Sequence, residues 1–91
     1  MYDLINILTE SATPVKSTEI EQALGIPSTT VRELVNYCRC EGVAICSGRN
    51  GYWIATCPDD IKKTIANMEH RIAAMTKAID GLKSVLADSN T

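Results

Sequence analysis

Residues 46–55, CSGRNGYWIA, place one cation, Arg49, in a turn between two short apolar runs. Gly48 and Gly51 supply the backbone freedom that a hairpin turn needs, so the turn itself has no need of an arginine. A guanidinium at a hairpin tip can enter a narrow minor groove of DNA. Arg49, with Asn50 beside it, is therefore a candidate DNA contact.

A second group of polar side chains lies between residues 28 and 36. Its members are Ser28, Thr29, Thr30, Arg32, Glu33 and Asn36. Arg32 can bond bidentately to guanine and Asn36 to adenine, while Glu33 can accept a hydrogen bond from cytosine. Ser28 is a predicted helix N-cap, where backbone amides and neighbouring hydroxyls suit a phosphate oxygen. A solvated helix face is the alternative explanation for each of these residues.

Residues suited to catalysis or metal binding form no recognisable pattern. The chain has four cysteines, which are Cys38, Cys40, Cys46 and Cys57. Cys38 and Cys40 point in nearly opposed directions on a helix, so we expect free thiols and no metal site. Cys57 precedes a helix start, where a redox role is the alternative. There is no nucleophile with a base and no phosphate-binding glycine loop, so we expect no cofactor and no enzyme activity.

The elements that position these residues follow from apolar spacing and from breakers. We expect a helix over residues 2–10 and a second one opened by a capping box of Thr18 and Glu21 and closed by Gly25. A third helix should run over 29–41 and stop at Gly42. Two strands, over 43–46 and 52–55, then form a β-hairpin around the Arg49 turn. The side chains expected in the core are Leu4, Ile5, Leu8, Ile20, Ala23, Leu24, Val31, Leu34, Val35 and Cys38.

The last helix, opened by Pro58, carries an unbroken heptad repeat. Its a positions are Ile65, Ile72, Ile79 and Leu86, and its d positions are Ile61, Met68, Met75 and Leu82. Isoleucine at three a positions favours two parallel strands, although Gly81 weakens the helix and the e and g residues fix the orientation poorly. We expect a homodimer through residues 61–86, with antiparallel pairing or a helical bundle as the alternatives to a parallel pair. His70, at an f position, is expected to point to solvent and to have no role.

Charge and composition limit the function classes. The net charge of −2 excludes indiscriminate coating of nucleic acid, so any DNA binding must be local and selective. The start, MYDLINILTES, has an acid where a signal peptide needs positive charge, and no apolar run approaches the roughly 20 residues of a membrane span. We therefore expect a cytoplasmic protein with no membrane partner and no small-molecule ligand.

The order of helix, helix, short turn, helix and hairpin resembles the winged helix-turn-helix proteins over residues 2–56. The stretch STEIEQALGIPSTTVRELVNYCRCEGVA is similar to their helix-turn-helix, and ICSGRNGYWIA resembles their wing. The resemblance implies a mostly α fold with a small β-hairpin, in which the third helix enters the major groove and the wing lies along the DNA backbone. It places the residues from Ser28 to Asn36 given above in the groove, and Arg49 and Asn50 at the wing tip.

We thus expect two parts, a winged helix-turn-helix domain over 1–57 and a coiled-coil helix over 58–91. The function expected is sequence-selective binding of double-stranded DNA by a dimer, as a small transcriptional regulator or a replication accessory protein. A winged-helix module that binds another protein, or an adaptor built on the coiled coil, is the alternative.

Overall fold

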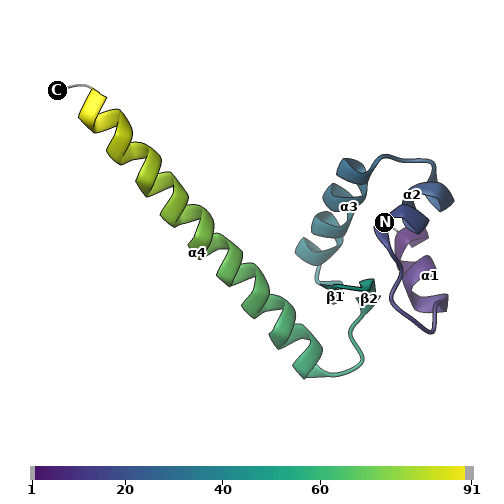
Figure 1. Ribbon diagram of the computed structural model, residues 1–91. Helices are drawn as coiled ribbons and strands as arrows, with labels where there is room; N and C mark the ends of the chain where they lie inside the picture. Colours follow the sequence, from purple (N-terminus) through teal and green to yellow (C-terminus); the bar gives the residue numbers. More distant parts are fainter. Residues whose placement is uncertain (1, 90–91) are drawn as a thin grey trace.

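The computed structural model describes residues 2–89, which form four α-helices and one antiparallel hairpin of two strands (Figure 1). The helices are α1 (Tyr2–Glu10), α2 (Ser17–Leu24), α3 (Ser28–Cys40) and α4 (Pro58–Ser89), and the strands are β1 (Ile45–Gly48) and β2 (Gly51–Ile54). The predicted order of elements is confirmed. The predicted ends of the strands are wrong by one or two residues, because β1 starts at Ile45 and β2 ends at Ile54.

The core lies between α1, α2, α3 and the hairpin. Its buried side chains are Leu4, Leu8, Val15, Ile20, Val31, Val35, Cys38 and Ile45. Ile5, Leu24 and Leu34 are only partly buried, and Ala23 is exposed, so the prediction of Ala23 as a core residue is wrong. At about 100° per residue, Ala23 lies about 60° around α2 from the buried Ile20 and on the opposite side from the partly buried Leu24, so it falls outside the buried stripe.

The starts of α2 and α3 differ from the predicted caps. α2 begins at Ser17, the residue at its N-cap is Lys16, and no side chain caps it. The predicted capping box of Thr18 and Glu21 is wrong; the Ser17 hydroxyl instead donates to the Glu21 carboxylate at 3.1 Å. α3 likewise begins at Ser28, with Pro27 rather than Ser28 at the N-cap. By contrast, Gly25 ends α2 in the left-handed conformation as predicted, with φ 64°.

The physical reason for the early start of α2 is a contact that the sequence did not predict. Val15 pairs with Tyr52 of β2 as an isolated antiparallel bridge, with two hydrogen bonds of 2.8 Å between their backbone groups. This pairing holds the chain extended up to Lys16, and the helix starts at the next residue. The bridge fixes the hairpin to the start of α2.

Arg39 fixes the hairpin to α3 from the other side. Its Nε donates to the carbonyl of Ile45 at 2.8 Å, and its Nη2 donates to the Ser47 hydroxyl at 3.2 Å. Burial lowers the pKa of Arg39, and so does the like charge of Arg71, whereas Tyr52 and Cys46 act to raise it. Arg39 therefore has a structural role in holding β1.

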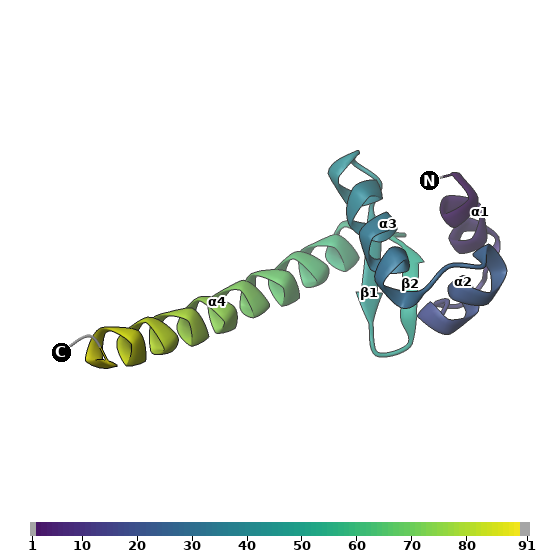
Figure 2. The ribbon, with the colours of Figure 1, turned by 90° about the horizontal axis from the view of Figure 1, so that it is seen from above.

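α4 packs against β1 through its first turns and then runs away from the other helices (Figures 1 and 2). Thr64 is buried at this contact and Met68 partly so. The described chain measures 58 × 31 × 23 Å, which agrees with a helix of about 48 Å that projects beyond a small body. Within residues 2–89, no helix has the length and apolar character needed to cross a membrane.

Candidate nucleic-acid interface

The polar residues predicted on the third helix lie on one face of α3, and all but Thr30 are exposed. Ser28, Thr29, Arg32, Glu33 and Asn36 are exposed, whereas Thr30 is half-buried at the edge of this face. No side chain caps the first turn of α3. The backbone amides of that turn are therefore left to solvent or to an external acceptor.

The hairpin tip presents Arg49 and Asn50, both exposed, as a two-residue connection. The last pair of the ladder is Gly48 with Gly51, directly below the tip. Neither tip residue has a positive φ, whereas Gly51 has φ 123°. A Cβ at Gly51 would lie 2.3 Å from the Val15 carbonyl oxygen, so glycine is required here for its φ and for the close approach of the Val15 bridge.

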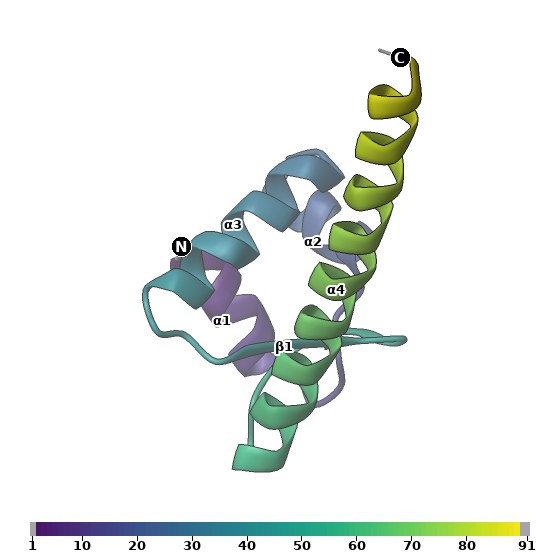
Figure 3. The same cartoon turned by 90° about the vertical axis from the view of Figure 1, so that its left-hand side faces the viewer.

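The two predicted regions lie on the same side of the molecule. Figures 2 and 3 both show the hairpin turn and the amino-terminal end of α3 directed to one side, while α4 leaves in another direction. The fold thus brings Arg49 and Asn50 at the hairpin tip and the first turns of α3 to a common side.

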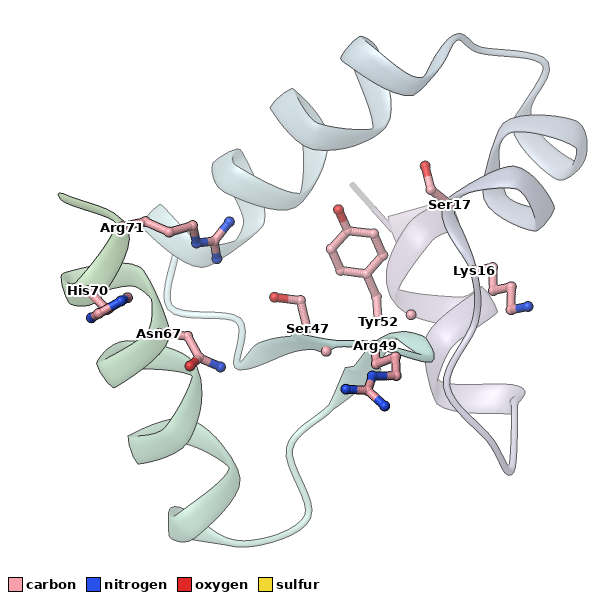
Figure 4. A pocket seen from close by; sticks show the side chains of 10 residues that line it. Lys16, Ser17, Ser47, Arg49, Tyr52, Asn67, His70 and Arg71 are labelled. Carbon is pink, nitrogen blue, oxygen red and sulfur yellow. The ribbon is translucent and has the colours of Figure 1, made fainter. Parts of the chain in front are cut away.

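A cleft of about 670 Å³ adjoins the hairpin tip, and the sequence did not predict it. The side chains around it come from the start of α2, the hairpin and α4, as Figure 4 shows. Its lining residues include Lys16, Ser17, Ser47, Arg49, Tyr52, Asn67, His70 and Arg71. Within residues 2–89, none of the lining side chains is a carboxylate, and no ion pair involves Lys16, Arg49 or Arg71.

His70 is exposed, as predicted for an f position, and it borders this cleft. Asn67, His70 and Arg71 occupy the c, f and g positions of the heptads. The sequence could have indicated these three residues. The first turns of α4 pack on the hairpin by their a, d and g positions, and the neighbouring helix face must then lie at the edge of that contact.

The predicted seam of α4 is exposed along most of its length in the single chain. The exposed fraction of the side chains is 62% at Ile72, 65% at Met75, 48% at Ile79, 71% at Leu82 and 63% at Leu86. Ile61 and Ile65, nearer the body, are 39% and 49% exposed. Together with Arg39 and residues 42–46, these two residues, Thr64 and Met68 line a groove of about 340 Å³ beside β1.

The cysteines are free thiols, with Cys38 and Cys46 buried and Cys40 and Cys57 exposed. Burial raises the pKa of the Cys38 thiol. In the part of the chain that the structure describes, no group of three or more histidine, cysteine or acidic side chains is placed to hold a metal ion.

Comparison with known proteins adds no relative: no family model, no curated protein and no solved structure matches this chain.

Proposed function

We propose that the protein is a winged helix-turn-helix protein that binds double-stranded DNA sequence-selectively as a homodimer, in transcription regulation or replication. The observation that carries the proposal is the common direction of the Arg49–Asn50 turn and the amino-terminal end of α3 (Figures 2 and 3). A helix and a flanking hairpin arranged in this way can occupy a major groove and the adjacent backbone or minor groove at once.

The chemistry of α3 supports a role in reading base sequence. Arg32 and Asn36 are exposed on the same helix face, and both are suited to bidentate contacts with purines. Glu33, between them, would repel phosphate but can accept a hydrogen bond from cytosine. Such a face favours selected sequences over DNA in general, in keeping with the net charge of −2.

The wing supports a role in backbone or minor-groove contact. Arg49 is exposed, is unpaired within residues 2–89 and has no part in the hydrogen bonds of the hairpin. A surface cation of this kind contributes little to stability, so its place at the tip is explained better by an external anion.

The exposed seam of α4 supports pairing with a second copy. Five consecutive a and d side chains from Ile72 to Leu86 are between 48% and 71% exposed. Each fully buried side chain of this type contributes about 1.5–3 kcal/mol, so leaving all five in water costs several kcal/mol per chain. The two recognition helices of a two-fold dimer would then meet an inverted repeat, with half-sites about one helical turn, or a multiple of it, apart.

The test is selection of bound sequences from a random DNA pool, followed by affinity measurements over a series of salt concentrations. The parent should enrich an inverted repeat, and its affinity should fall steeply as salt rises. Asn36→Ala and Arg32→Ala should each cost about 1–3 kcal/mol on the preferred site and relax the preference at one position. Arg49→Ala should weaken binding to all sequences while leaving the melting temperature unchanged.

Lys77→Ala is the matched control, since it removes one exposed cation from α4 far from α3 and the hairpin. It should leave the selected sequence and the affinity as in the parent. If the parent enriches no sequence and shows no salt-dependent affinity for DNA, the proposed DNA binding is refuted and the protein-binding alternative leads.

A further inference from the structure

The cleft beside the hairpin tip holds more positive charge than the chain as a whole would suggest. The net charge is −2, yet Lys16 just before α2, Arg49 of the hairpin and Arg71 of α4 all line this one space. In Figure 4 the Lys16 side chain is turned away from those of Arg49 and Arg71. None of the three cations is paired with a carboxylate in the described part of the chain. Like charges gathered without counterions favour an anion between them.

The uncharged side chains of the cleft are hydrogen-bond donors as well. Ser47 accepts from Arg39 at 3.2 Å, so its own hydroxyl hydrogen remains available to another acceptor. The Asn67 amide and the Tyr52 hydroxyl add further donors to the lining. Ser17 is already engaged, because its hydroxyl donates to Glu21. A set of guanidinium, ammonium, hydroxyl and amide groups matches the oxygens of a phosphate.

The positive charge of Arg71 is not explained by the pairing of α4. Arg71 occupies a g position of α4, and in a parallel pair of helices it would lie opposite the e position five residues on, Thr76 of the second copy. Parallel pairing of two α4 helices therefore gives Arg71 no acidic partner. The positive charge of Arg71 also lowers the pKa of Arg39, which is bonded to Ser47, although burial lowers that pKa more. A bound anion would offset this repulsion.

We propose that the cleft formed by Lys16, Arg49 and Arg71 binds a phosphate group, and that the DNA backbone beside the wing supplies it. The choice of DNA rests on the proposed function, because Arg49 belongs both to the hairpin tip and to the cleft. The helix that forms the dimer seam thereby also contacts the nucleic acid, through Arg71 and its neighbour His70. The length and direction of α4 then affect DNA affinity as well as pairing.

The first experiment compares Arg71→Gln with Lys77→Gln, which removes the same charge from the same helix outside the cleft. Arg71→Gln should lower DNA affinity about tenfold on every sequence and reduce the slope of log affinity against log salt by about 1. Lys77→Gln should change neither, and sedimentation should show both variants paired as the parent is. Equal effects of the two substitutions on affinity and slope would overturn the proposal.

The second experiment keeps the cleft testable if the parent binds no DNA. Inorganic phosphate is titrated at constant ionic strength against chloride, and the backbone amide signals of Asn67 and His70 are followed by NMR. Saturable shifts that Arg71→Gln abolishes, in a parent without DNA affinity, would support a phosphate site and overturn both DNA as its source and the proposed function. The opposite result would overturn the phosphate site but not the proposed DNA binding. In that result phosphate causes no such shifts, the parent binds DNA, and Arg71→Gln binds DNA with the salt slope of the parent.

Discussion

Replacement of Gly51 by alanine tests how the hairpin is held to the rest of the fold. Gly51 has φ 123°, and an added Cβ would lie 2.3 Å from the Val15 carbonyl oxygen and 2.9 Å from the Lys16 amide nitrogen. Forcing alanine into this conformation costs about 1–3 kcal/mol, and displacing a backbone neighbour costs about as much again. We expect Gly51→Ala to lower the free energy of unfolding by about 2–6 kcal/mol, a large part of the roughly 5–15 kcal/mol typical of domains.

Two other glycines provide matched controls that separate the causes. Gly25 has φ 64° but no atom within 4 Å of an added Cβ, so Gly25→Ala should cost about 1–2 kcal/mol from conformation alone. Gly81 has neither a positive φ nor a close neighbour and lies within α4, so Gly81→Ala should stabilise the helix by about 1 kcal/mol.

The assay is urea unfolding of the parent and the three variants at one fixed protein concentration, because the proposed pairing would make stability concentration-dependent. Trp53 is the single tryptophan of the chain and packs over Gly48, so its fluorescence reports on the hairpin. Circular dichroism follows the helices in the same samples. If Gly51→Ala were no more destabilising than Gly25→Ala, the close approach of Val15 would not hold the hairpin, and this explanation of the hairpin's position would be refuted.

Two further predictions concern α4. We expect the parent to sediment as a dimer at micromolar concentration and Ile72→Asp as a monomer, because the substitution places a charge in the seam. Ala73→Asp, at a solvent-facing b position, should leave the dimer intact. A monomeric parent would contradict pairing through the seam. Asp60→Asn should flatten the acid side of the melting curve against pH. The Asp60 carboxylate accepts from the Thr56 amide at 3.3 Å, and this bond chiefly depresses its pKa, with smaller lowering from Trp53 and other neighbours. Its contribution to stability is therefore present above its unfolded pKa of about 4 and is lost as pH falls through the lower folded value. A parent curve matching that of Asp60→Asn would contradict the prediction.

The sequence by itself determined the order of the elements and most of the core. The apolar spacing in α1 and α3 and the breakers Gly25 and Gly42 act over a few residues, so they can be recognised without knowing the fold. The heptad repeat of α4 was equally evident, since it depends on spacing within one helix. The polar face of α3 and the Arg49 turn followed from the same local patterns.

Tertiary structure decided which segments that are distant in the sequence contact each other. The bridge of Val15 to Tyr52 keeps the backbone extended up to Lys16, so α2 starts at Ser17 and the predicted capping box is wrong. The structural role of Arg39 was not predicted from the sequence: it holds β1 through two hydrogen bonds. The partner of a long side chain depends on which distant segment lies beside it.

The cationic cleft could be found only in the folded chain. Lys16 and Arg49 are far apart in sequence from Arg71, and no spacing rule relates them. They meet because α4 crosses β1 at Thr64, while the Val15 bridge sets Lys16 beside the hairpin. Local sequence patterns fix which face a residue takes on its own helix or strand, and the packing of those elements decides which faces share one site.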